Sequence, residues 1–111
     1  MMSREQLAQW MEDGLRNKSF RESQSRYILW DEETGTALGC ALGAALVGKM
    51  KSAKAACHVY AKRKKGPVVN GSPLFAVILD ISPELAQAID QAHWNDKPAW
   101  QIAAELREQA V

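Results

Sequence analysis

Apolar positions recur at helical spacing at the start and at the end of the chain. Ser3 can cap a first helix whose apolar face begins at Leu7 and whose end frays after Gly14. Ser82, which is followed by proline, is typical of a helix start, and a turn at residues 95–98 leads into a last helix. The pattern therefore predicts one helix at the N-terminus and a pair of helices at the C-terminus.

Short strands are predicted between these helices. Residues 27–30 are aromatic or large and aliphatic, and the acidic, glycine-containing segment 31–35 that follows is typical of a hairpin turn. A return strand over residues 36–38 is therefore expected. Residues 74–79 are uniformly apolar, which favours a strand buried on both faces, although so short a run is also compatible with a helix.

The middle of the chain predicts one amphipathic helix from about Cys40 to Lys62. Apolar residues recur there at helical spacing and form one stripe, made of Leu42, Leu46, Met50, Ala53, Cys57 and Tyr60. A break near Gly48 is the alternative, because glycine in a helix interior costs about 1 kcal/mol relative to alanine. The four-residue spacing of Gly35, Gly39 and Gly43 would also let another backbone approach closely, although Gly35 better suits the hairpin turn.

Together these elements predict a mostly helical α+β fold, with residues 1–111 in a single domain that contains a small antiparallel hairpin or sheet. The expected core residues are Leu42, Leu46, Leu85, Ile89, Ile102 and Leu106. Apolar residues make up 47% of the chain and charged residues 24%, which is typical of a globular protein.

The N-terminus is too charged for a signal peptide, and the longest uncharged stretch, residues 34–48, is too short to cross a bilayer. A cytoplasmic protein with no membrane segment is therefore expected.

The net charge of +1 hides an uneven distribution along the chain. Residues 49–65 carry basic side chains and no acid, and most of these side chains fall opposite the apolar stripe. A basic helix face of this kind could bind the phosphates of a nucleic acid through Lys51, Lys54, His58, Lys62, Arg63, Lys64 and Lys65. The simpler interpretation is a solvated helix face, because charge runs are usually solvated and no aromatic residue is interleaved with these lysines.

The sequence offers no group of residues able to carry out a reaction. Cys40 and Cys57 form no C-x-x-C pair, and both are expected to be free thiols. His58 is next to Cys57, but adjacent residues on a helix point about 100° apart, so the two are not expected to work as a nucleophile and base. Asp90 and His93 share a helix face, yet two ligands make a weak metal site. We therefore expect no catalytic residue, no metal, no cofactor and no enzyme activity.

The C-terminal helix pair carries the strongest interface candidates. Trp94 and Trp100 flank the turn between the two helices, and tryptophan anchors protein interfaces as often as it fills cores. A helix-turn-helix function is disfavoured, because the last helix would present Glu105 and Glu108 to the phosphates of DNA. The leading hypothesis is a non-catalytic protein–protein interaction module that can form a homodimer, and the alternative is nucleic-acid binding through residues 49–65.

Four segments carry a resemblance to a known group of proteins. They are Leu29–Gly35 (LWDEETG), Gly39–Ala44 (GCALGA), Ser82–Leu85 (SPEL) and Trp100–Ala103 (WQIA). In these segments the chain resembles a diffuse group of small, uncharacterised bacterial and phage-borne proteins, in which a Cys-x-Leu-Gly-Ala helix follows a hairpin and a helix pair closes the domain. The resemblance implies this architecture and no activity, and the basic segment 49–65 lies outside it.

Overall fold

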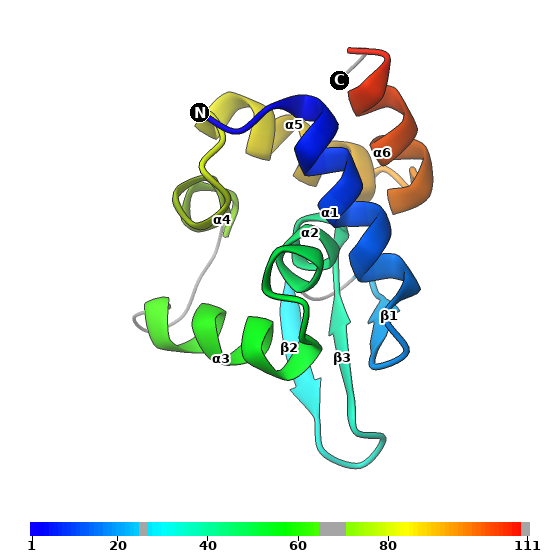
Figure 1. The fold of residues 1–111 in the computed structure, drawn as a ribbon, viewed down its shortest axis with the longest axis vertical. Coiled ribbons are helices and arrows are strands. Elements are labelled where there is room, and N and C mark those ends of the chain that lie inside the picture. The colour runs from blue at the N-terminus through cyan, green and yellow to red at the C-terminus, as the bar shows by residue number, and fades with distance from the viewer. Residues whose placement is uncertain (25–26, 65–70, 110–111) are drawn as a thin grey trace.

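The fold was obtained as a computed structural model, which describes residues 1–24, 27–64 and 71–109 of the chain. These residues form six helices and a three-stranded sheet, which confirms the predicted, mostly helical α+β class (Figure 1). In chain order the elements are α1 (Arg4–Arg16), β1 (Phe20–Glu22), β2 (Ile28–Asp31), β3 (Thr36–Gly39), α2 (Ala41–Met50), α3 (Ala53–Arg63), α4 (Ser72–Leu79), α5 (Pro83–Trp94) and α6 (Ala99–Arg107).

Serine side chains cap the N-termini of α1 and α5, the two helices whose starts are predicted from the sequence. The hydroxyl oxygen of Ser3 accepts a hydrogen bond from the Gln6 amide, 3.1 Å away, at the start of α1. Ser82 accepts one from the Leu85 amide, also at 3.1 Å, at the start of α5. Each bond satisfies an amide that the helix itself leaves unpaired, so the predicted start of both helices is confirmed.

The sheet has the order β1-β3-β2, with β1 parallel and β2 antiparallel to β3. The predicted hairpin between residues 27–30 and 36–38 is confirmed as β2 and β3. Strand β1 escapes sequence analysis because it spans only Phe20–Glu22 and has no alternating pattern. The sheet is therefore mixed rather than antiparallel, and β2 forms one of its two edges.

The prediction of one continuous helix from Cys40 to Lys62 is wrong. Helix α2 ends at Met50, because Lys51 has a left-handed backbone with φ of 59°. The Ser52 hydroxyl then caps α3 by accepting a hydrogen bond from the Ala55 amide at 3.1 Å. The chain therefore turns three residues after Gly48, so that α3 leaves the axis of α2 and lies against β2 (Figure 1).

The preferred interpretation of residues 74–79 as a strand is also wrong, because they belong to helix α4. Pro73 suits the first turn of a helix, where its missing amide hydrogen has no partner to lose. Asp80, with φ of 58°, ends the helix in a left-handed conformation. Residues 74–79 are uniformly apolar because most of this short helix is buried, and within these six residues only Val77 is largely exposed.

The core forms around α2, whose residues Ala41–Gly48 are all buried. The predicted core residues Leu42, Leu46, Ile89, Ile102 and Leu106 are fully buried. Leu85 is only partly buried and packs against the edge of this cluster, which corrects its assignment to the core. The described residues thus share one apolar core, with α1 lying across α2 (Figure 1).

Two glycines bring the backbones of α1 and α2 into contact. A Cβ atom at Gly48 would lie 1.8 Å from the carbonyl oxygen of Trp10 on α1. A Cβ atom at Gly14 on α1 would lie 1.8 Å from the carbonyl oxygen of Ala44 on α2. The two helices can cross at this distance only because both positions carry hydrogen in place of a side chain.

Replacing Gly48 by alanine tests this contact. Helix propensity alone predicts that Gly48→Ala stabilises α2 by about 1 kcal/mol. We expect the opposite, a loss of about 3 kcal/mol or more in the free energy of unfolding, because the new methyl group overlaps the Trp10 carbonyl. Urea denaturation followed by circular dichroism measures the difference.

The matched control is Gly35→Ala in the hairpin turn, where nothing lies within 4 Å of the new Cβ. The left-handed backbone at Gly35, with φ of +67°, disfavours alanine, and because there is no overlap, we expect the free energy of unfolding to fall by only about 1 kcal/mol. A Gly48→Ala protein as stable as the unmodified protein would contradict the proposed backbone contact.

Candidate functional site

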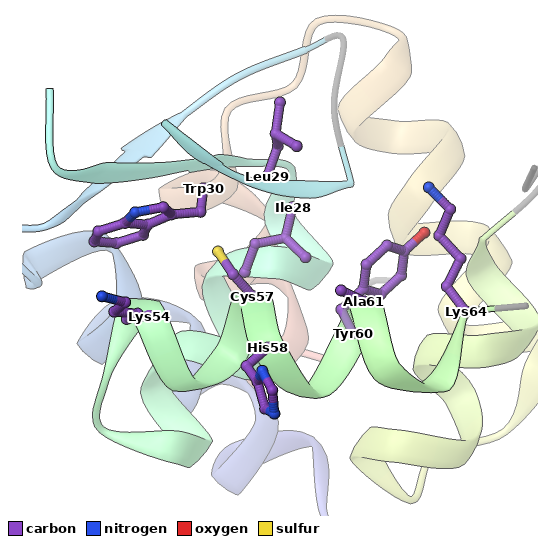
Figure 2. Close-up of a pocket in the computed structure, with 9 residues that line it drawn as sticks. All are labelled: Ile28, Leu29, Trp30, Lys54, Cys57, His58, Tyr60, Ala61 and Lys64. Carbon is purple, nitrogen blue, oxygen red and sulfur yellow. The ribbon is translucent and has the colours of Figure 1, made fainter. Parts of the chain in front are cut away.

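An open groove runs between helix α3 and strand β2 (Figure 2). It encloses about 640 Å³. Its lining residues are Ile28, Leu29 and Trp30 from β2, and Lys54, Cys57, His58, Tyr60, Ala61 and Lys64 from α3 and its C-cap. The groove forms because α3 is separate from α2 and lies beside β2. The predicted single helix over residues 40–62 therefore gave no sign of this α3–β2 groove.

The floor of the α3–β2 groove is largely apolar. The ring of Tyr60 stacks on Phe75 of α4, with 5.1 Å between the ring centroids, and Tyr60 itself is buried. Trp30 lies over the start of α3, where the Nζ atom of Lys54 is 5.6 Å from the ring centroid. Cys57 points its sulfur toward the strands between these two rings (Figure 2).

Three basic side chains, those of Lys54, His58 and Lys64, line the groove. Most residues of the predicted phosphate-binding set lie on α3 or its C-cap and are exposed, namely Lys54, His58, Lys62, Arg63 and Lys64. Within residues 1–24, 27–64 and 71–109, none of them forms an ion pair with a carboxylate. Lys51 is set apart at the C-cap of α2, and Lys65 lies outside the described residues. The side chain of Trp30 supplies an aromatic neighbour to Lys54 that the sequence pattern does not reveal.

A second candidate surface lies at the turn between α5 and α6. Trp94, the last residue of α5, is 73% exposed, and Trp100, near the start of α6, is 64% exposed. Behind this tryptophan turn, the Nζ atom of Lys97 is 2.7 Å from a carboxylate oxygen of Glu105, which fixes the turn to α6. The structure therefore leaves both predicted interface residues on the surface.

Burial makes the two thiols poor nucleophiles. It raises the pKa of Cys40 to about 12 and that of Cys57 to about 11, because the thiolate loses the solvation that water provides. The imidazole of His58 points away from the strands, whereas the sulfur of Cys57 points toward them (Figure 2). The neighbouring Cys57 and His58 therefore do not form a nucleophile–base pair.

Asp90 and His93 have separate partners within the fold. The hydroxyl of Tyr27 donates a hydrogen bond to Asp90 at 3.1 Å. His93 is only 2% exposed, and its Nε2 atom lies 2.6 Å from Oε2 of Glu22. The same carboxylate oxygen accepts a hydrogen bond from the Ala99 amide at 2.9 Å. Glu22 thus ties the end of β1 to both α5 and α6, a role that sequence analysis misses because it does not predict β1.

No group of three or more histidine, cysteine, aspartate or glutamate side chains in the described ranges could hold a metal ion. Among the helices of the same ranges, none combines the length and the apolar character needed to span a membrane.

Comparison of the chain with protein-family models, curated proteins and solved structures finds no match. The resemblance to small bacterial and phage-borne proteins therefore stays a prediction.

The raised thiol pKa values predict slow modification of the native protein. At pH 7.5 a thiol with a pKa of about 11 has roughly 100-fold less thiolate than one with a pKa of 9. We expect both cysteines to react slowly with a disulfide reagent in the folded state, with Cys57 accelerating only as the pH approaches 11. Unfolding in denaturant should release two fast thiols, and a fast native thiol at pH 7.5 would contradict this account of burial.

Removing the Glu22 carboxylate should destabilise the fold. Glu22→Ala leaves the nearly inaccessible imidazole of His93 and the Ala99 amide without their acceptor. Because the Glu22 side chain is 29% exposed, we expect a loss of about 2 kcal/mol, less than for a fully buried pair. Thermal and urea unfolding measure it, with Glu32→Ala in the exposed hairpin turn as the control that should change stability little. Equal effects of the two substitutions would show that Glu22 is an ordinary surface residue.

Proposed function

We propose that this domain is a non-catalytic protein–protein interaction module that contacts its partner through the tryptophan turn. The observation that carries the proposal is the exposure of Trp94 and Trp100, at 73% and 64%, on the two sides of one turn. A large aromatic side chain left in water contributes little to folding, whereas its burial in an interface contributes much to binding. The turn itself is held to α6 by Lys97 and Glu105, so it presents the two rings from a fixed base.

The chemistry of the other side chains supports binding rather than catalysis. Both thiols are buried with raised pKa values, and His93 is occupied by Glu22. The exposed imidazole of His58 has no nucleophile directed toward it from the neighbouring Cys57 (Figure 2). A catalytic site needs a reactive group and a base within hydrogen-bond distance of each other, and these residues provide no such pair.

A second copy of the chain is the partner that the proposal names first. In a two-fold contact the same turn serves both subunits, so each copy contributes both tryptophans. Burial of roughly 150 to 250 Å² per ring would give about 600 to 1,000 Å² for four rings. Stable interfaces bury about 1,200 to 2,000 Å² in total, so we expect a reversible dimer that dissociates on dilution.

Sedimentation velocity and light scattering over a wide concentration range test this proposal. We expect a monomer–dimer equilibrium that Trp94→Ser or Trp100→Ser weakens at least tenfold without changing the unfolding midpoint, since both residues lie outside the core. Val77→Ser, which removes another largely exposed apolar side chain from α4, is the matched control and should leave the equilibrium unchanged. A monomer at every concentration, or a dimer indifferent to both tryptophans, would contradict self-association through this turn.

Nucleic-acid binding through α3 is the second candidate function. The exposed and unpaired state of Lys54, Lys62 and Lys64 among the described residues favours it. The aromatic rings near these lysines argue against nucleic-acid binding, because the ring of Tyr60 is buried against Phe75 and the ammonium group of Lys54 lies over the ring of Trp30. Base stacking needs a free ring face, which neither of them provides well.

A titration with generic DNA and RNA at two salt concentrations separates the two functions. Binding that falls steeply with salt, and that weakens when Lys51, Lys54 and Lys62 are changed to alanine or glutamate, would favour the nucleic-acid function. Self-association without such binding would favour the protein-interaction module.

A further inference from the structure

Strand β2 leaves one of its edges without a neighbouring strand in the described residues, since the sheet has the order β1-β3-β2. The Cys40 amide donates a hydrogen bond to the carbonyl oxygen of Tyr27, so the backbone polar groups of Tyr27 point toward β3. Alternate residues of an antiparallel strand direct their backbone groups to opposite sides. Ile28 and Trp30 therefore direct their amide and carbonyl groups away from β3, toward the open edge.

The α3–β2 groove lies along this same edge. The consecutive residues Ile28, Leu29 and Trp30 all line it, although their side chains alternate between the two faces of the sheet. A new strand paired with β2 would lie about 4.8 Å away and would direct every second side chain toward α3. Those side chains would meet the apolar surface of Cys57, Tyr60 and Ala61, so the groove has the position and the lining of a missing fourth strand.

A lysine side chain lies at each end of the groove. Lys54 lies at one end of α3 and Lys64 at the other, as Figure 2 shows. Ten residues of helix separate them by about 15 Å, at a rise of about 1.5 Å per residue. An extended peptide covers that distance in roughly four or five residues, at about 3.4 Å each. Carboxylates that flank a short apolar strand would therefore reach the two ammonium groups.

We propose that the open edge of β2 binds an extended acidic segment of a partner protein, which joins the sheet as a fourth strand beneath α3. Backbone hydrogen bonds to Ile28 and Trp30 supply the pairing, and apolar side chains of the segment fill the α3–β2 groove. The flanking carboxylates pair with Lys54 and Lys64. This inference rests on the proposed function, in that the partner is a protein, but it assigns a different surface and a defined kind of ligand.

Two other occupants fit this edge less well. A second copy of the chain would bring its own α3 to the same face of the joined sheet, because a two-fold axis perpendicular to the sheet keeps both helices on one side. The two helices would then compete for the space above the shared edge. A single-stranded nucleic acid could use the lysines, but the buried and stacked ring of Tyr60 gives its bases no free aromatic face.

The test uses a blocked synthetic peptide of alternating valine and threonine with glutamates at both ends. We expect saturable binding to the full chain by fluorescence anisotropy. We also expect slower hydrogen exchange, measured by NMR, at the amides of Ile28 and Trp30 than in the free protein. The same peptide with alternate backbone amides methylated keeps the side chains and charges but cannot pair as a strand, so it should bind at least tenfold more weakly.

Substitutions in the protein separate the groove from general charge effects. Ala61→Gln places a longer side chain in the groove from an exposed helical position and should weaken peptide binding at least tenfold. Lys54→Glu and Lys64→Glu should each weaken it by a similar factor. Lys18→Glu makes the same charge change at an exposed position just before β1, the opposite edge of the sheet, and should leave the affinity within twofold.

The possible failures of this inference differ from those of the proposed function. Absence of peptide binding, or equal binding of the methylated peptide, would overturn strand addition while leaving dimerisation through the tryptophan turn untouched. Dimerisation that slows exchange at Ile28 and Trp30 would show that a second copy occupies the edge, and would overturn the acidic segment. An oligothymidine that displaces the peptide and binds more tightly would overturn this inference and favour the nucleic-acid function of α3, while dimerisation through the tryptophan turn would still be tested separately.

Discussion

The backbone contact between α1 and α2 is the constraint on which the rest of this structure depends. Gly48 meets the Trp10 carbonyl and Gly14 meets the Ala44 carbonyl, so each helix supplies one glycine to the crossing. Such a short distance between helices leaves no room for side chains there, and it buries α2 from Ala41 to Gly48. With α2 fixed at the centre, its two ends determine where β3 enters and where α3 leaves.

The candidate binding groove follows from the way α2 ends. The left-handed backbone of Lys51 and the cap at Ser52 turn the chain out of the axis of α2, which places α3 against β2. If α2 continued straight, no helix would lie beside the edge of β2, and the groove would not form. The turn thus converts a basic helix face into one side of a groove whose other side is the edge of a sheet (Figure 2).

Sequence analysis succeeds where a local interaction determines the structure, and it fails where a distant contact does. The starts of α1 and α5 are set by Ser3 and Ser82, whose partners lie three residues away, and both are predicted. Near Lys51 the sequence offers only Gly48 as a sign of the break, and because the apolar stripe stays in phase across it, one continuous helix is the preferred prediction. The same limit applies to the candidate site, because the exposed residues of α3 are identified in advance but their neighbour Trp30 is brought to them only by the fold.

The two candidate surfaces lie at opposite edges of the sheet, and this separation has a functional consequence. Glu22, at the end of β1, holds His93 and Ala99, which are the chain neighbours of the two exposed tryptophans. The α3–β2 groove lies along β2, with β3 between the two edges. Neither surface includes the glycines of the α1–α2 contact, so exposed residues of each, such as Trp94 and Lys54, can be changed without disturbing that contact. Under the two proposals, one protein would bind at the tryptophan turn and another at the open strand, and the two partners would not compete for the same residues.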